Sequence, residues 1–95
     1  MMYFAIRFYK KSGKIDKTLT HDISPAMLKM WGLTNTTAKS KDTIVFDSNG
    51  KVLAYYEGTG DFPKVCDVTG EHIDKYCPGL LEACLKDVGA TEEAK

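Results

Sequence analysis

The sequence has no long apolar run, and this absence argues against a membrane protein. No apolar stretch approaches the roughly 20 residues that a membrane-spanning helix needs. Residues 1–9 are apolar, but Arg7 lies within this run and Lys10 and Lys11 follow it. A secretory signal carries its basic residues before the apolar segment instead. We therefore expect a soluble, cytoplasmic protein that does not bind membranes.

Cysteines are few, and their number is odd: Cys66, Cys77 and Cys84. A small secreted domain stapled by disulfides normally has an even set, so we expect reduced thiols packed as small hydrophobic side chains. Together with His72 they could offer zinc four ligands, but five, four and six residues separate them. These spacings match no usual paired zinc motif, so no metal site is predicted.

Cys77 carries one further hypothesis. It directly precedes Pro78 at an expected helix start, where the helix dipole would favour the thiolate and lower the pKa of Cys77. A reactive thiol would follow from this placement.

Recognisable catalytic motifs are also missing. No serine or cysteine lies in a nucleophile turn, and Gly58-Thr59-Gly60 lacks the Gly-Lys-Ser/Thr ending of a phosphate-binding loop. A chain of 95 residues has little room for a deep pocket. We predict that the protein is not an enzyme, with no catalytic residue and no cofactor.

The net charge of zero hides an uneven distribution. Residues 1–41 contain eight basic and two acidic residues, and residues 42–95 contain five basic and eleven acidic residues. The first half thus carries +6 and the second −6. Such asymmetry can mark an interaction surface. We expect it to cancel instead, through interleaving of the two halves in one sheet.

The strongest structural signal is a β-hairpin over residues 43–57, where two β-branched and aromatic runs flank an Asn-Gly pair. A two-residue loop, Asn49-Gly50, would pair Phe46 with Leu53. A three-residue loop would pair Phe46 with Val52. One residue of register moves every side chain of the second strand to the other face of the sheet.

Asp47 at the first turn position and Gly50 at the fourth favour the three-residue loop. This loop pairs Ile44 with Ala54, whereas the shorter loop pairs Ile44 with Tyr55. Tyr55 then points outward. Five side chains are predicted to face the core: Ile44, Phe46, Val52, Ala54 and Tyr56.

A first hairpin is predicted from residues 3–9 and 14–20, which the turn of residues 10–13 joins. Phenylalanine and isoleucine alternate strictly with other residues along the first strand. The turn sets two pairs: Phe8 with Ile15, and Phe4 with Leu19.

Two helices are predicted. Ser24 is a good N-cap, Pro25 suits the first helical position, and Gly32 is a plausible end. Lys29 points outward, and the apolar residues at helical spacing form the buried face: Ile23, Met27, Leu28, Met30 and Trp31.

The second helix is predicted to follow a single turn at residues 70–76. Pro78 would break a helix that continued through it, so it is placed at the first helical position. Gly89 is expected to end this helix.

The order β-β-α-β-β-α predicts an α+β fold, in which an antiparallel four-stranded sheet has both helices on one face. Residues 33–42 are expected to form a loop, and residues 65–68 could add a short edge strand. We expect a single domain over residues 1–89 and a frayed tail over residues 90–95.

The predicted open face of the sheet would carry Tyr3, Tyr9 and Tyr55, and tyrosine-rich patches are typical of interfaces. We therefore predict a small domain that acts through protein–protein contact or homodimerisation. It would pack this open face, or an edge strand, against an unidentified protein partner or a second copy.

Nucleic acid is the alternative partner. The first hairpin combines tyrosines, on which bases can stack, with basic side chains that can bind phosphate. These basic residues are Arg7, Lys10, Lys11, Lys14 and Lys17. Lysines on an edge strand also serve to prevent edge-to-edge pairing, so this is the second hypothesis.

Overall fold

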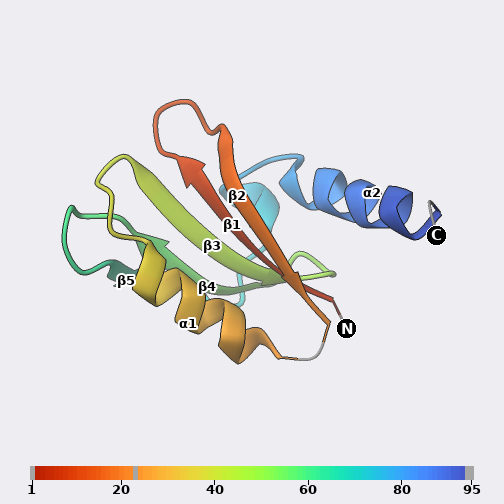
Figure 1. Ribbon diagram of the computed structural model, residues 1–95, viewed down its shortest axis with the longest axis horizontal. Coiled ribbons are helices and arrows are strands. Elements are labelled where there is room, and N and C mark those ends of the chain that lie inside the picture. Colours follow the sequence, from red (N-terminus) through yellow and green to blue (C-terminus); the bar gives the residue numbers. More distant parts are fainter. Residues whose placement is uncertain (1, 23, 94–95) are drawn as a thin grey trace.

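The computed structural model describes residues 2–22 and 24–93. A five-stranded antiparallel sheet lies at its centre, with strand order β2-β1-β3-β4-β5 (Figure 1). The strands are β1 (Tyr3–Tyr9), β2 (Ile15–His21), β3 (Lys41–Asp47), β4 (Val52–Glu57) and β5 (Lys64–Cys66). The other elements are the helices α1 (Pro25–Asn35) and α2 (Leu80–Glu93) and the short 3₁₀ helix η1 (Ile73–Lys75). The α+β class is confirmed.

The prediction of four strands is wrong, because β5 adds a fifth at the edge beside β4. Val65 pairs with Tyr56 in this strand. The short edge strand that residues 65–68 could add is present, but it lies at Lys64–Cys66. The order is therefore β-β-α-β-β-β, followed by η1 and α2.

The two helices cover opposite faces of the sheet, so the prediction of both on one face is wrong. The α1-side core comprises Ala5, Leu28, Val45, Ala54 and Tyr56. The α2-side core, which η1 and α2 cover, comprises Phe4, Ile6, Phe8, Ile44, Phe46, Val52, Ile73, Leu80 and Cys84. The central strands β1 and β3 each contain consecutive buried residues, as in a sheet that is covered on both faces.

The strand order also keeps the two halves of the chain apart. β1 and β2 lie together at one edge, and β3, β4 and β5 lie together on the other side. The expected interleaving of the basic and acidic halves is therefore wrong. Contact between the halves occurs mainly along the β1–β3 boundary and beneath α1.

The first hairpin contains a β-bulge. Phe8 pairs with Ile15 as predicted, but the register shifts between Arg7 and Phe8, and Arg7 pairs with Lys17. Asp16 is the extra residue. Beyond the bulge Phe4 pairs with Thr20 and not with Leu19, so that predicted pair is wrong. Leu19 instead packs at the border of the α1-side core.

The second hairpin also contains a bulge. Phe46 pairs with Val52, as the three-residue loop predicts, and Leu53 is the extra residue. Beyond it Ile44 pairs with Tyr55, which only the two-residue loop had predicted. The bulge turns Tyr55 towards the α2-side core, so its predicted outward position is wrong.

All five side chains that the hairpin prediction assigned to the core are buried. The bulge divides them between the two faces. Three lie in the α2-side core: Ile44, Phe46 and Val52. Ala54 and Tyr56 lie in the α1-side core.

Helix α1 begins at Pro25, as predicted, but continues past Gly32 to Asn35. Gly32 lies against the sheet, where an added Cβ would stand 2.6 Å from the ring of Tyr56. Its role is close packing and not helix termination. The N–H and hydroxyl groups of Thr36 both donate to the Gly32 carbonyl and close the helix end. Ile23, placed in the buried face by its spacing, lies outside the described residues.

The predicted single turn contains η1, but α2 begins at Leu80 and not at Pro78. Pro78 and Gly79 form a tight turn in which the Leu80 N–H donates to the Cys77 carbonyl at 3.1 Å. Gly79 has a φ of 82°, which a type II turn requires after proline. The helix runs to Glu93, so the predicted end at Gly89 is wrong. In Figure 1, α2 extends beyond the edge of the sheet.

Candidate interaction surfaces

The three tyrosines predicted to share an open face lie on opposite sides of the sheet. Tyr3 borders the α1-side core. Tyr9, 36% exposed, lies on the same side, with the Lys41 Nζ 4.9 Å from its ring centre. Tyr55 packs on the other side, against the rings of Phe8 and Tyr76. Both faces are covered, and the structure does not join these tyrosines into one surface.

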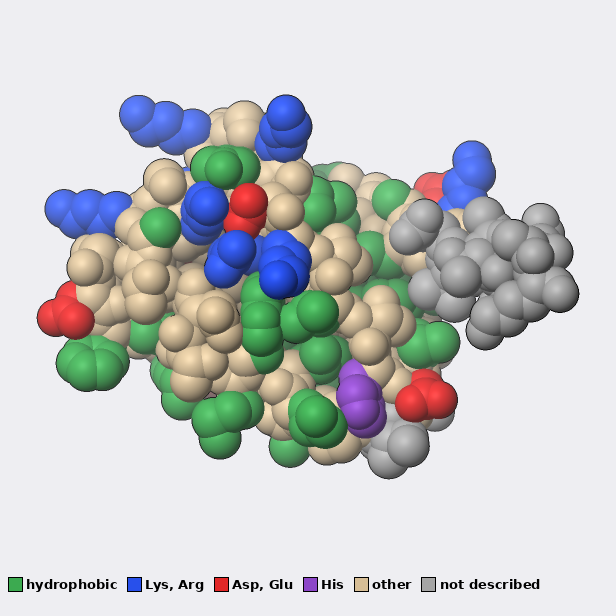
Figure 2. Space-filling model, viewed as in Figure 1, with side chains coloured by type: hydrophobic (Ala, Val, Ile, Leu, Met, Phe, Trp, Pro, Cys, Tyr) green, Lys and Arg blue, Asp and Glu red, His purple; other side chains and the backbone are tan. Residues whose placement is uncertain are grey.

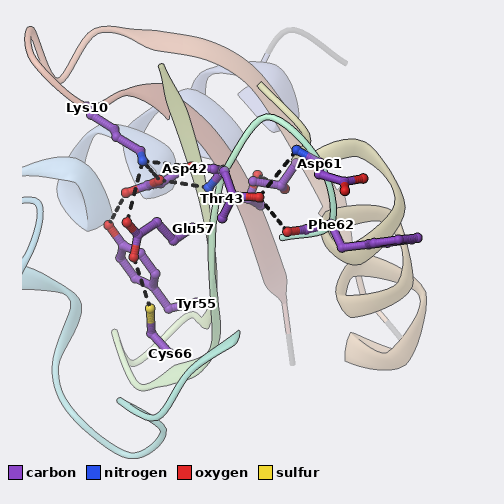
Figure 3. Close-up of polar contacts among 11 residues, drawn as sticks. Lys10, Asp42, Thr43, Tyr55, Glu57, Asp61, Phe62 and Cys66 are labelled. Carbon is purple, nitrogen blue, oxygen red and sulfur yellow. Dashed lines mark hydrogen bonds and ion pairs between the residues drawn. The ribbon is translucent and has the colours of Figure 1, made fainter. Parts of the chain in front are cut away.

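A buried carboxylate, Asp42, organises the α2 side of the sheet (Figure 3). Asp42 accepts hydrogen bonds from the Tyr55 hydroxyl at 2.7 Å and the Gly58 N–H at 3.2 Å. The Lys10 Nζ lies 3.5 Å from Asp42 and 3.6 Å from Glu57, and donates to the Gly58 carbonyl. Burial and the bond to Asp42 raise the pKa of Tyr55. These contacts tie β1, β3 and β4 together, which indicates a structural role.

Beside this cluster lies a groove of about 410 Å³, between the turn of the first hairpin and the start of α2. Its walls are mainly apolar and include Phe8, Ile15 and Leu80, with Lys10 at one side. Cys77 also lines the groove. Its volume falls within the range of small-molecule pockets, but no charged group within it is left for a ligand, since Lys10 already contacts two carboxylates.

The pKa of Cys77 is shifted in the direction opposite to the prediction. Burial, and then the nearby Asp42, raises the pKa of Cys77. The prediction of a lowered pKa is wrong because α2 begins three residues later, so the thiol does not lie at the helix N-terminus. Burial and Glu57 also raise the pKa of Cys66. Among the described side chains, no group of three or more His, Cys, Asp or Glu residues is placed to hold a metal ion.

The five basic residues of the first hairpin fall into two groups: two are held in ion pairs with carboxylates and three are exposed. Arg7 donates to Asp16 at 2.6 Å, and its guanidinium lies 5.4 Å from the centre of the Trp31 ring. The hydrogen bond from Arg7 lowers the pKa of Asp16, against a smaller effect of burial, and Lys41 lowers it further. Lys10 belongs to the Asp42 cluster. Three residues are exposed at the turn and on the edge strand β2: Lys11, Lys14 and Lys17.

The outward face of α1 is apolar as far as Leu33, and the polar Thr34 and Asn35 are exposed at its C-terminal end. Leu28 and Gly32 face the sheet, whereas Met27 and Met30 are 61% and 62% exposed. The predicted burial of these two methionines is therefore wrong. Leu33 is 44% exposed, and Lys29 is the single charged residue among the 11 of this helix. Figure 2 shows hydrophobic side chains gathered on the α1 side of the molecule, below the Lys and Arg side chains.

The loop between β4 and β5 adds an aromatic side chain, Phe62, which is 84% exposed. The Thr59 hydroxyl donates to the Phe62 carbonyl at 2.6 Å and accepts from the Asp61 N–H at 3.3 Å (Figure 3). The Gly60 N–H donates to the Thr37 carbonyl at 2.7 Å. These bonds fix the loop beside the chain that follows α1.

Val65 is 62% exposed and pairs with Tyr56, whose ring lies beneath α1. It therefore lies on the same side of the sheet as α1. We define the α1 surface as Met27, Met30, Leu33, Phe62 and Val65. The sequence signal for the α1 surface was the nearly uncharged composition of residues 25–35. From the helical spacing alone, these apolar residues were assigned to a single buried stripe.

No described helix is both long and apolar enough to span a membrane. Comparisons with models of protein families, with curated proteins and with solved structures found no match for this chain.

Proposed function

We propose that this protein acts through protein–protein contact and that the α1 surface is its binding site. The observation that carries the proposal is the exposed helix α1, whose outward face, like its inward face, is apolar as far as Leu33. A helix that is apolar all round is normally buried, and contiguous exposed apolar patches commonly mark interaction sites. A partner that covers α1 would complete its burial.

The distribution of exposed apolar side chains supports this choice of surface. Eight large apolar side chains are exposed among the described residues, and five of them belong to the α1 surface. The others include Ile15 on β2 and Leu85 on α2, at 44% and 41% exposure. Phe62 has the highest exposed fraction of the eight. Hydrogen bonds hold the backbone of the loop that carries this ring, and aromatic side chains are enriched at interfaces.

The test isolates the wild type, Met30→Glu and Leu85→Glu from the cells that make them. It compares the binding partners that each protein retains. We expect partners of the wild type to be lost with Met30→Glu, because the introduced carboxylate would be buried without a counter-charge. Leu85→Glu is the matched control, since it adds the same charge outside the α1 surface. Equal retention of every partner by Met30→Glu, in a protein with an unchanged circular dichroism spectrum, would remove the proposal.

Nucleic-acid binding through the first hairpin is the second candidate, supported by the exposed Lys11, Lys14 and Lys17. Binding of labelled single-stranded oligonucleotides should weaken with salt and on replacement of these three lysines by glutamine. The matched control replaces Lys51, Lys64 and Lys75 in the same way. Absence of binding at low salt would eliminate this candidate.

A non-enzymatic role and a cytoplasmic location belong to the same proposal. The polar groups around Asp42 are hydrogen-bonded to one another, which supports a non-enzymatic role. The three cysteines form no disulfide in the described part of the chain, which supports a reducing compartment.

A further inference from the structure

We infer that the α1 surface binds a second copy of this chain, with α1 packed antiparallel against α1 of the other copy. This inference rests on the proposed function and names the partner. The twofold axis would pass near Met30. The two α1 helices would then form the centre of the dimer, with one sheet on either side and with η1 and α2 on the outer faces of the sheets.

The spacing on the outward face of α1 fits a pair of helices. Ala26, Met30 and Leu33 follow one another at intervals of four and three residues, and all three are exposed. Alternating intervals of this kind place side chains along the seam where two helices pack. Leu28 and Gly32 occupy the opposite side of the helix, against the sheet.

The face is also complementary to itself. In an antiparallel pair centred on Met30, this residue meets Met30 of the second copy. Residues at equal distances on either side of the centre then face each other, so Met27 meets Leu33 of the second copy. A twofold interface requires a surface patch that fits itself in this way. Both pairs bring together apolar side chains of similar size. Ala26 meets Thr34 of the second copy, whose hydroxyl is already bonded within its own helix.

Charge favours a second copy over an acidic or basic partner. The outward stripe of α1 carries no carboxylate, ammonium or guanidinium group, and Lys29 lies on its flank, partly buried. A charged partner would lose hydration along this stripe without gaining an ion pair. An identical apolar stripe leaves no charge uncompensated.

The flanks would enlarge the contact. A helix of 11 residues is only about 16 Å long, and a stable interface buries roughly 1,200 Å² or more. Phe62 lies beside the C-terminal end of α1, because Gly60 is bonded to Thr37. In an antiparallel pair this end lies over the first turn of the other helix. Each Phe62 would therefore reach that turn near Pro25 of the second copy. By the twofold symmetry this contact would occur twice in the dimer.

The experiment is sedimentation velocity of the full chain over a wide concentration range. The wild type should dimerise. Met30→Glu should weaken the dimer by roughly 100-fold or more, because two carboxylates would meet at the axis and juxtaposed like charges cost several kcal/mol. Leu85→Glu, which adds the same charge elsewhere, should leave the dissociation constant unchanged.

A mixture tests the geometry. Met30→Lys alone should also be monomeric, whereas an equimolar mixture of Met30→Glu and Met30→Lys should dimerise, because residue 30 faces itself across the axis. A mixture that stays monomeric would overturn the antiparallel arrangement centred on Met30, provided that both variants keep the wild-type circular dichroism spectrum.

A monomeric wild type at every concentration would overturn the second copy as the partner. The proposed function would still stand if Met30→Glu lost other partners recovered from cells. A wild-type dimer that Met30→Glu leaves intact would overturn the inference as well. Retention of all partners by the same variant would then remove the proposed function separately.

Discussion

The two faces of the sheet are covered in different ways. On one face η1 and the start of α2 enclose a bulky core, in which the Phe4 and Phe46 rings lie 5.3 Å apart. On the other face α1 packs over a thinner core with small residues, among them Ala5, Ala54 and Gly32. These small residues let α1 lie close to the sheet. Leu28 and Trp31 pack inward, and Met27, Met30 and Leu33 are left on the outside, where they form part of the proposed binding surface.

The two faces also differ in how deeply their carboxylates are buried. Asp42, on the α2 side, is 7% exposed and is bonded by a hydroxyl and a backbone N–H group. Asp16, on the bulge of β2, is more exposed and is held by Arg7 and Lys41. A buried, hydrogen-bonded group contributes more to stability than a surface ion pair. We therefore expect the α2 side to supply most of the stability and the α1 side most of the binding.

The largest expected effect is that of Phe46→Ala on the α2 side. Phe46 is fully buried, and removal of such a ring costs about 3–5 kcal/mol in free energy of unfolding. Denaturant titration measures the loss. Met30→Ala on the outer side of α1, measured on the monomer, should change stability by less than about 0.5 kcal/mol. Equal losses for the two variants would break the comparison between the faces.

Gly32→Ala tests how closely α1 approaches the sheet. The added Cβ would stand 2.6 Å from Cδ2 of Tyr56 and 3.3 Å from Cγ2 of Thr43. Crowding of this kind costs about 1–3 kcal/mol, and alanine's better helix propensity returns up to about 1 kcal/mol. We expect a net loss in denaturant titration. Thr34→Ala, exposed on the same helix, is the control, and a Gly32→Ala protein more stable than the wild type would contradict the close packing.

The sequence allowed the pairs next to each turn to be predicted, because turn residues act locally. Phe8 with Ile15 and Phe46 with Val52 are both confirmed. The pairs farther from each turn were wrong, since a bulge adds one residue and reverses the faces of everything beyond it. Leu53 does not differ from an ordinary strand residue in type, and Asp16, although aspartate is uncommon in strands, does not by its type specify a bulge. In the folded chain Asp16 contacts Arg7 and Lys41, and Leu53 packs against the α1-side core.

The candidate site was harder to predict for a related reason. Apolar residues at helical spacing show that α1 has an apolar stripe, but they do not show its width. Gly32 was predicted to end the helix, but in the structure it lies in close contact with Tyr56. Once Gly32 is placed inward, Met27 and Met30 must lie outward. This placement requires the sheet, which the spacing alone does not contain.

Tyr55→Phe probes the polar cluster of the α2 side. It removes the hydroxyl that donates to Asp42, and loss of a hydrogen bond to a buried charged group costs about 1–3 kcal/mol. Tyr56→Phe, which leaves Asp42 with all its partners, serves as the control. An unchanged free energy of unfolding for Tyr55→Phe would show that Lys10 and Gly58 suffice to hold Asp42.

The same residue predicts a pH dependence. The pKa of Tyr55 is raised above its ordinary value of 10.0 in the folded protein, so folding favours the protonated phenol. This stability is fully present below pH 10 and is lost as the pH rises from the ordinary value towards the folded one. Phenolate absorbance should show late ionisation of Tyr55, and also of Tyr56, whose pKa burial raises. Tyr55→Phe should remove one late-ionising group.

The smallest expected effect is that of Asp16→Asn on the α1 side. The pKa of Asp16 lies below its ordinary value of 3.8 because Arg7 hydrogen-bonds the carboxylate. The stabilisation is therefore present above that value and is lost as the pH falls through the folded pKa. The difference in unfolding midpoint between wild type and Asp16→Asn should be small near neutral pH, shrink in high salt and vanish in acid. Asp22→Asn is the control, and a loss larger than that of Tyr55→Phe would reverse the ranking of the two faces.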